Sequence, residues 1–247
     1  MSLRDKVAVV VGGGTGIGRA TAILFAAEGA RVAVFGRREP LLVDTVTAIR
    51  KAGGAALHVA GDVAREADVA RLIEATTGAR GGIDILVNAA AVRGPAAFTD
   101  ITAAEFEASL RTNLLGAFVV TRAVVAPMRA RGGGSIIHIG SALGTVAVPL
   151  FAPYIASKGG LHMLARAAAV ELVADSIRVN VVAPGTIDTD IGAGVSQFRQ
   201  RMLEHRIPIR RAGHVDDVAR ACLYLATDAA RYVTGSVLAV DGGWTAS

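Results

Sequence analysis

Short apolar segments alternate with longer segments of helical periodicity from one end of the chain to the other. The apolar segments, which show little polar alternation, are 6–11, 31–35, 55–60, 84–88, 135–140, 177–182 and 237–240. The segments between them with apolar residues at helical spacing include 16–29, 39–52, 65–79, 102–131 and 154–174. Apolar strands separated by helices are typical of a parallel sheet covered on both faces. The pattern predicts an α/β fold, with a doubly wound (Rossmann) sheet of about seven parallel strands and helices on both faces.

This alternation continues through all 247 residues without a linker, a repeat or a low-complexity tract. Apolar residues make up 52% of the chain, which is enough to fill one large core. We therefore expect a single domain over residues 1–247. The stretch 186–213 breaks the regular alternation. We expect it to form a substrate lid over the carboxyl ends of the strands, where doubly wound sheets bind their ligands.

Composition excludes several classes of protein. Cys222 is the only cysteine, which rules out an intramolecular disulfide and a cysteine-based metal cluster. The five histidines show no spacing that resembles a set of paired metal ligands. No apolar run reaches the roughly 18–20 residues of a membrane-spanning helix, and the first residues lack the features of a secretory signal. We therefore expect a cytoplasmic protein with no metal site and no membrane partner.

The formal net charge is +5, and adjacent arginines occur at 37–38 and 210–211. Nucleic-acid binding uses charge of this sign. Aromatic residues, however, make up only 4% of the chain and do not interleave with the arginines. A solvated, arginine-rich surface fits better, and we expect no nucleic-acid partner. The pattern remains compatible with a few arginines that face a phosphorylated small molecule.

The first expected strand runs directly into GGGTGIG at 12–18, and a helical segment follows. In this setting Gly12 permits a tight turn, Gly16 lets the backbone approach a pyrophosphate, and Gly18 allows the helix to pack closely on the strand. The helix that begins here directs free N–H groups and the positive end of its dipole towards phosphates. A glycine-rich turn alone is common, but one between the first strand and a helix predicts dinucleotide binding.

The end of the second expected strand indicates which dinucleotide is bound. A carboxylate that accepts hydrogen bonds from the ribose 2′-hydroxyl is expected roughly 20 residues after the loop, and Gly36 takes that place. Arg37 and Arg38 follow immediately, and guanidinium groups bind phosphate bidentately. The sequence therefore favours NADP(H), with its 2′-phosphate. NAD(H) is the alternative if the two arginines are only exposed turn residues.

Further motifs follow one another in a fixed order. They are GDV at 61–63, DILVNAA at 84–90, TNLLGAF around Asn113, Ser141, YIASK at 154–158, IRVNVVAPGTIDT at 177–189 and VTGSVLAVDGG at 233–243. Each alone has an ordinary structural explanation, but their shared order makes a chance match improbable. Together with the glycine loop they resemble the classical short-chain dehydrogenases/reductases along nearly the whole chain. The resemblance implies an oxidoreductase that interconverts a secondary alcohol and a ketone by hydride transfer.

The resemblance also implies four catalytic residues. Tyr154 matches the general acid/base, and Lys158 matches the residue that lowers the tyrosine pKa and holds the nicotinamide ribose. Ser141 matches the hydroxyl that orients the substrate, and Asn113 matches the residue that holds a water in a proton relay. A free tyrosine has a pKa of about 10, which is too high for efficient proton transfer at neutral pH. A lysine ammonium one helical turn away favours the phenolate.

The cofactor-binding positions implied by the resemblance extend over several motifs. They are Gly12, Gly14, Thr15, Gly16, Ile17, Gly18, Arg37, Arg38, Asp62, Val63, Asn88, Ala89, Tyr154, Lys158, Pro184, Gly185, Ile187 and Thr189. The chain departs from the family pattern after the fourth strand, where Asn-Asn-Ala-Gly is common. Residues 88–91 here read Asn-Ala-Ala-Ala. The departure concerns sheet packing and the space beside the cofactor, and it does not touch the four catalytic positions.

The substrate is less well defined by the sequence. The loop 142–153 is apolar, which predicts a carbonyl or alcohol substrate with an apolar body lined by Val148, Leu150 and Phe151. The helical segments 102–131 and 154–174 are rich in alanine, which allows close packing between subunits. The resemblance points to a homotetramer, with Trp244 near a subunit contact.

Two alternative functions remain open. Arg129 and Arg131 end the segment 102–131, where 3-oxoacyl-carrier-protein reductases present basic groups to an acidic carrier. Basic residues at a helix C-terminus also suit the helix dipole. The other alternative is a non-catalytic protein that senses nucleotides, which the intact set of four catalytic residues disfavours.

Overall fold

A computed structural model of the chain describes residues 2–189 and 196–247. Its strands form one parallel sheet in the order β3-β2-β1-β4-β5-β6-β7. The strands are β1 Val7–Val11, β2 Arg31–Gly36, β3 Ala55–Ala60, β4 Ile85–Asn88, β5 Gly134–Ile139, β6 Ile177–Pro184 and β7 Val237–Val240. The prediction of a doubly wound, seven-stranded parallel sheet is therefore confirmed, and each strand lies within two residues of its expected bounds.

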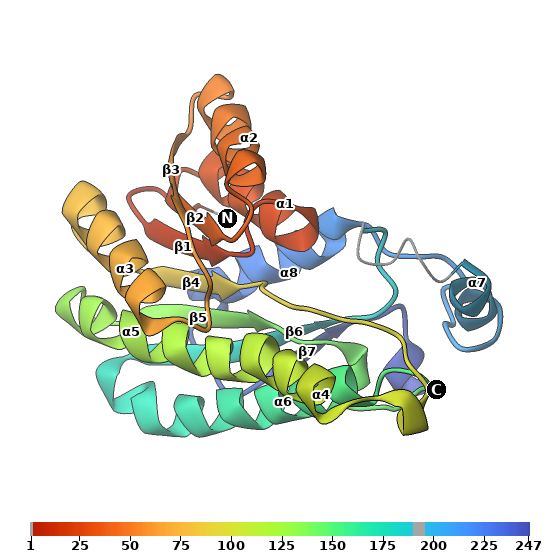
Figure 1. Cartoon of the computed structure of the whole chain (residues 1–247). Coiled ribbons are helices and arrows are strands. Elements are labelled where there is room, and N and C mark those ends of the chain that lie inside the picture. Colours follow the sequence, from red (N-terminus) through yellow and green to blue (C-terminus); the bar gives the residue numbers. More distant parts are fainter. Residues whose placement is uncertain (1, 190–195) are drawn as a thin grey trace.

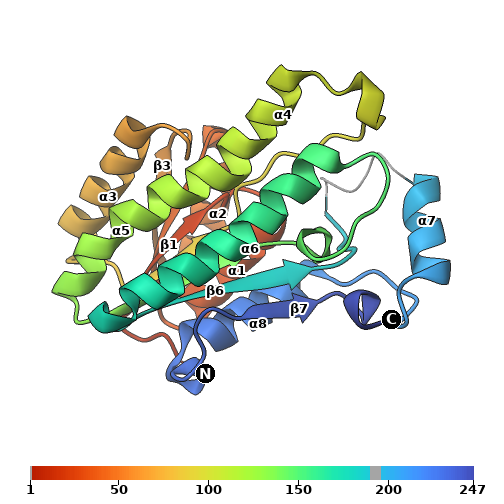
Figure 2. The ribbon, with the colours of Figure 1, turned by 90° about the horizontal axis from the view of Figure 1, so that it is seen from below.

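Helices cover both faces of the sheet (Figure 1). The α-helices are α1 Gly16–Ala27, α2 Glu39–Lys51, α3 Glu66–Arg80, α4 Ala103–Leu110, α5 Gly116–Ala130, α6 Ala152–Leu172, α7 Ser196–His205 and α8 Val215–Ala226. One layer holds α1, α2 and α8, and the opposite layer holds α3, α4, α5 and α6, as a second view also shows (Figure 2). Helix α7 lies apart from both layers, beyond the carboxyl ends of the strands.

The apolar run of β1 shows why the sheet is buried on both sides. Ala8 and Val10 belong to the cluster of buried side chains on one face. Val9 and Val11 belong to the cluster on the other face. All four are at most 1% exposed. Because successive side chains of a strand point to opposite faces, a strand that lies between two helical layers must be apolar throughout.

The segment 102–131 is not one regular α-helix as predicted. Helix α4 starts at a capping box in which the Thr102 hydroxyl accepts from the Glu105 backbone N–H and the Glu105 carboxylate accepts from the Thr102 N–H. A π-helical turn, Arg111–Leu115, then separates α4 from α5. Such turns insert one residue into the helical repeat and often occur at functional sites. This turn carries Asn113.

The predicted lid region 186–213 contains structure that the sequence pattern did not indicate. Its two ends meet, because Ile187 and Gly213 form a parallel bridge beside β6. Helix α7 lies within the segment, and Met202 and Ile207 are buried. Residues 190–195 lie outside the described part of the chain, so the lid remains a proposal.

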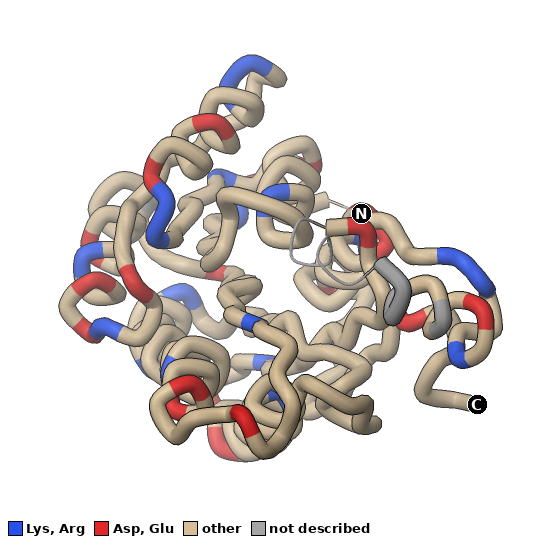
Figure 3. The backbone as a smooth tube through the Cα atoms, turned by 45° about the vertical axis from the view of Figure 1, so that its right-hand side comes forward, with Lys and Arg blue, Asp and Glu red and all other residues tan. Residues whose placement is uncertain are grey.

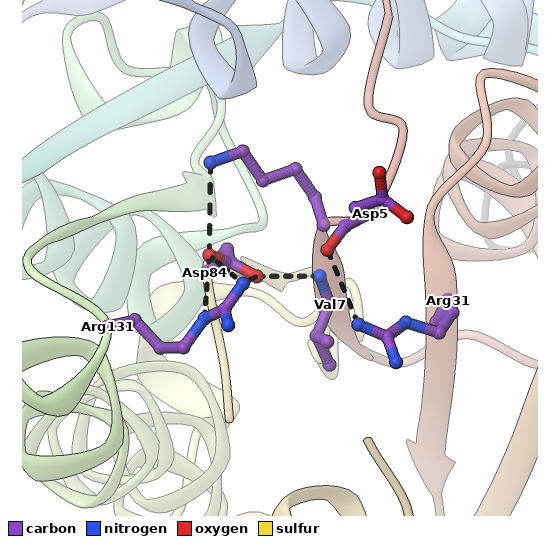
Figure 4. A network of polar contacts seen from close by, with 6 residues as sticks. Asp5, Val7, Arg31, Asp84 and Arg131 are labelled. Atoms are coloured by element: carbon purple, nitrogen blue, oxygen red, sulfur yellow. Dashed lines mark hydrogen bonds and ion pairs between the residues drawn. The ribbon is translucent and has the colours of Figure 1, made fainter. Parts of the chain in front are cut away.

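A buried carboxylate joins the amino ends of the central strands. Asp84, at the start of β4, accepts the backbone N–H of Val7 in β1 at 2.8 Å (Figure 4). The Arg131 guanidinium, just after α5, donates to both Asp84 oxygens at 3.2 and 3.3 Å. The Lys6 ammonium lies 3.9 Å from the same group. This edge of the sheet is therefore fixed by polar contacts, opposite to the edge that binds ligands in this type of fold.

Replacing Asp84 by alanine should lower the free energy of unfolding by about 2–3 kcal/mol, because the buried Val7 N–H then loses its acceptor. The ion pair with the partly exposed Arg131 adds less. Urea denaturation measures the change. Asp84→Asn, which keeps an acceptor oxygen, should lose about half as much. Unfolding of Asp84→Ala at the wild-type urea concentration would show that the Val7 bond contributes nothing.

Candidate active site

One elongated pocket runs along the carboxyl ends of the strands, from the glycine loop after β1 to Trp244 near the end of the chain. All of the predicted cofactor residues except Asn88 line it, and so do three of the four predicted catalytic residues: Ser141, Tyr154 and Lys158. Asn88 is buried at the end of β4, and Asn113 is buried behind the pocket wall. The structure thus brings segments from across the whole sequence together at one edge of the sheet.

The glycine loop has the shape of a cradle that side chains would fill. Gly12 has φ +75°, and a Cβ there would lie 2.8 Å from the Ala89 carbonyl carbon. A Cβ on Gly18 would collide with the Gly12 carbonyl oxygen. Gly16, also with positive φ, begins α1, whose first turn contains no acidic residue. The loop therefore fits a pyrophosphate group, which would be held by backbone N–H groups and the helix dipole.

The residues at the end of β2 form the other end of the pocket. Gly36, Arg37 and Arg38 all line it. The Arg38 guanidinium donates to the Thr15 hydroxyl of the glycine loop at 3.2 Å. Both arginines are exposed and begin the connection into α2. Positive charge therefore lies beside the loop, at the place where the sequence predicted a 2′-phosphate contact.

Lys158 is buried in the middle of the pocket and is only 1% exposed. Its ammonium group donates to the backbone carbonyl of Ile139, at the end of β5, at 2.7 Å. The same nitrogen lies 5.6 Å from the centre of the Tyr154 ring, one turn earlier on α6. Ser141 follows β5, and its hydroxyl accepts the N–H of Leu143 at 3.1 Å. The end of β5 and the start of α6 therefore bring Ser141, Tyr154 and Lys158 together in the pocket lining.

Burial sets the proton affinities of this group. It raises the pKa of Tyr154, while a hydrogen bond with Ser141 and the charge of Arg93 act in the opposite direction. Burial also lowers the pKa of Lys158 to about 7. Tyr154 therefore holds its proton at neutral pH in this structure. The predicted lowering of the tyrosine pKa by Lys158 is not among the effects seen here, and it stays a prediction for the complex with cofactor.

Asn113 fixes the elements around the site. Its side-chain oxygen accepts the Val92 N–H at 2.8 Å, and its amide donates to the Val92 carbonyl at 3.0 Å. The amide also donates to the Ser157 hydroxyl at 2.9 Å. Ser157 in turn donates to the Tyr154 carbonyl at 2.7 Å. Asn113 thus links the loop after β4 to the first turn of α6. Its predicted role in holding a water stays a prediction.

The substrate end of the pocket is apolar, as the sequence predicted. Val148 and Phe151 line it, whereas Leu150 points elsewhere, with 42% of its surface exposed. Trp244 also lines the pocket, a position that the sequence pattern did not indicate. Arg93 was missed as well, because its loop carries no motif and only the fold places it beside Tyr154.

The core holds His138, one of the five histidines, and the single cysteine, Cys222. His138 is buried in β5 with Nε2 3.2 Å from the Thr121 hydroxyl, and its burial lowers its pKa to about 3. Cys222 is buried in α8, which raises the pKa of its thiol to about 12. Within residues 2–189 and 196–247, no cluster of three His, Cys, Asp or Glu residues is arranged to hold a metal ion. In the same residues, no helix has the length and apolarity to cross a membrane.

Comparison with known proteins identifies the family. A family model described as enoyl-(acyl carrier protein) reductase matches residues 12–245. Cis-4-hydroxycyclohexanecarboxylate dehydrogenase of Sinomonas cyclohexanicum is 39% identical over 98% of this chain and 97% of its own. A short-chain type dehydrogenase/reductase from Mycobacterium marinum has 35% identity and a TM-score of 0.95, covering 100% and 98% of the two chains.

A gluconate 5-dehydrogenase from Burkholderia cenocepacia, solved in complex with NADP and tartrate, is 35% identical, with a TM-score of 0.95 and coverage of 100% and 97%. The matches extend over the complete sheet and the pocket at its carboxyl edge. They agree with the family that the order of motifs in the sequence indicated. The chain belongs to the classical short-chain dehydrogenase/reductase family and is an NAD(P)-dependent oxidoreductase of that family.

Proposed function

We propose that the protein interconverts a secondary alcohol and a ketone with NADP(H), and that Tyr154 is the general acid/base. The observation that carries the proposal is the group formed by the buried Ser141 and Lys158 and the half-buried Tyr154, which lies between the glycine-loop end of the pocket and its apolar end. Relatives support the chemistry, since one is named as the dehydrogenase of cis-4-hydroxycyclohexanecarboxylate, which is a secondary alcohol. When bound, the nicotinamide supplies the hydride in reduction and accepts it in oxidation.

In the reducing direction Tyr154 donates its phenolic proton to the carbonyl oxygen of the substrate. The upward shift of the Tyr154 pKa by burial means that this proton is present at neutral pH. Ser141, at the end of β5, donates a hydrogen bond to the oxygen on which charge develops. The Lys158 Nζ lies 5.6 Å from the centre of the tyrosine ring, and in its protonated form it would lower the cost of forming the phenolate.

Support for NADP(H) comes from the charge at the end of β2. Arg38 is held beside Thr15, and Arg37 lines the same part of the pocket. The last residue of β2, where a carboxylate would accept from a ribose 2′-hydroxyl, is Gly36. The Burkholderia relative was solved with NADP. The 2′-phosphate would lie against the two guanidinium groups.

A screen of ketones, sugars, steroids and acyl thioesters with NADPH and NADH tests the proposed function, with NADPH oxidation followed by absorbance. We expect turnover of ketones with an apolar body, and turnover at least about 100-fold slower in Tyr154→Phe. Oxidation of NADPH only in the presence of carbon–carbon double bonds, as in an enoyl reductase, would contradict the proposal.

The alternative of a carrier-protein reductase gains no support from its two arginines. Arg129 is paired with Asp175 at 2.7 Å, and Arg131 is paired with Asp84. Both lie at the amino ends of the strands, away from the pocket. Nor does the distribution of charge favour nucleic acid, since basic and acidic residues are interspersed along the described chain (Figure 3).

We also propose that the protein is a homotetramer. An apolar hollow on the outer face of α4, α5 and α6 includes Leu115 and Phe118, which are 44% and 43% exposed. In many oligomers, exposed apolar surface on helices is covered by a neighbouring subunit. Phe118→Arg should therefore dissociate the tetramer into smaller species, measured by light scattering at micromolar concentration. Val43→Arg on α2, at a similarly exposed apolar position, is the control. A monomeric wild-type protein would contradict the proposal.

A further inference from the structure

Arg93 is a cationic side chain at the substrate end of the pocket. It lies in the loop after β4, and its guanidinium carbon is 5.1 Å from the centre of the Phe151 ring and 6.0 Å from that of Tyr154. Both distances are within the range of cation–π contacts. The charge therefore lies close to the proposed proton donor, beside Phe151 and not beside the glycine loop.

The backbone on both sides of Arg93 is held in place. Val92, directly before it, is bonded through both its N–H and its carbonyl to the Asn113 side chain. Ala96, three residues after it, donates its N–H to the Leu150 carbonyl at 2.9 Å. The Arg93 side chain therefore extends from a fixed loop, and it is partly buried. A binding group that is preorganised in this way loses little entropy when a ligand binds.

The surroundings strengthen the electrostatic effect of this guanidinium. One cluster of apolar side chains contributes to this end: Leu143, Val148, Phe151, Met202 and Trp244. Among the described residues that line the pocket, the only carboxylate is Asp62, which lies after β3 at the cofactor end. In apolar surroundings a charge acts over a longer distance than it does in water. An anionic group on the substrate would meet attraction here from Arg93 and also from Lys158.

We infer that Arg93 makes the enzyme selective for substrates that carry a carboxylate on the apolar body, near the carbonyl or alcohol carbon. The inference rests on the proposed function, and it adds the charge of the substrate. A guanidinium pairs with a carboxylate through two parallel hydrogen bonds, which binds and orients the substrate with respect to Tyr154. The competing explanation is that Arg93 acts only on the proton affinity of Tyr154, which would change turnover of charged and neutral substrates alike.

Matched acids and esters separate the two explanations. The probes are benzoylformate and 3-benzoylpropanoate, each against its methyl ester, with NADPH. We expect Arg93→Gln to raise KM for the acids by about 10- to 100-fold, the range for a charge-assisted pair. KM for the esters should stay within about twofold, and Arg93→Lys should restore part of the preference for the acids. Arg220→Gln on α8, an exposed arginine outside the pocket, controls for the loss of one positive charge.

A second measurement does not depend on turnover. Trp244 is the only tryptophan in the chain and lines the pocket, so its fluorescence reports binding there. Phenylacetate should quench this fluorescence at concentrations about 10- to 100-fold lower in the wild type than in Arg93→Gln, while phenylacetamide should show no difference. Selective quenching by the acid without turnover of any ketone would support the anion site and contradict the proposed function.

The inference would be overturned if neither assay showed a preference for the acid in the wild type. Equal losses for acid and ester in Arg93→Gln, together with a shift in the pH profile of both, would overturn it as well. In that case Arg93 would act through Tyr154 alone. Turnover of esters and acids at equal rates would leave the proposed oxidoreductase function intact.

Discussion

Tyr154→Phe should lower kcat by about 10²- to 10⁴-fold, the range expected when a general acid is lost, and should leave dinucleotide binding nearly unchanged. Phenylalanine occupies the same space beside Lys158 but has no proton to donate. The Lys158 ammonium remains bonded to the Ile139 carbonyl, so its contact with a ribose is not removed. The effect should therefore fall on kcat and not on the affinity for NADPH.

Steady-state kinetics on the best ketone of the screen measures kcat, and NADPH fluorescence titration measures binding. Tyr232 is fully exposed and far from the described pocket lining, so Tyr232→Phe is the matched control and should keep wild-type values for both. A near-normal kcat in Tyr154→Phe would mean that another group supplies the proton. A loss of NADPH binding would mean that the ring substitution disturbs the pocket itself.

The strands and the glycine loop could be predicted because their signals are local. A strand buried on both faces is mostly apolar, and four of the six residues of the run 177–182 are apolar. The structure extends this strand to Pro184, since the chain pairs with β7 up to that residue. Likewise, Gly18 is required by the carbonyl oxygen of Gly12, which belongs to the same loop, and Gly12 by its own positive φ of +75°, so the sequence motif already contains a local reason for both.

The π-helical turn at Asn113 could not be predicted, because its cause is not local. The side chain of Asn113 bonds to Val92, which precedes it by 21 positions, and to Ser157, which follows it by 44. Nothing in the residues around 113 specifies these partners, so the helical periodicity alone predicted a continuous helix. The significance of Arg93 has the same origin, since its ring contacts are with residues of another segment.

The preference for NADP(H) should reverse in Gly36→Asp. In the family, NAD-dependent members carry an aspartate here, which accepts from the ribose 2′-hydroxyl and repels a 2′-phosphate. The structure has room for it, since a Cβ on Gly36 would meet only the Leu42 Cδ2 atom, at an ordinary 3.6 Å. The new carboxylate would lie beside Arg37 and Arg38 and partly neutralise the charge that favours the phosphate.

The unmodified protein should prefer NADPH over NADH by roughly 10- to 150-fold, if one guanidinium contact contributes about 1.5–3 kcal/mol. Arg37→Ala should weaken NADPH binding and leave NADH nearly unchanged. Arg38→Ala tests a second contribution, because this guanidinium is already held beside Thr15. The decisive quantity is kcat/KM for both cofactors with one substrate.

Gly78→Asp is the control for the added charge, because Gly78 is exposed on α3 and a Cβ there meets no atom within 4 Å. It should leave the cofactor ratio at the wild-type value. Equal kcat/KM for NADPH and NADH in the wild type, or a preference for NADH, would mean that Arg37 and Arg38 face the solvent and that another residue selects the cofactor. If the wild type prefers NADPH but Gly36→Asp keeps that preference, attraction by the arginines outweighs repulsion by the aspartate. The ratio in the double variant Gly36→Asp/Arg37→Ala would then show how the selectivity is divided between the two positions.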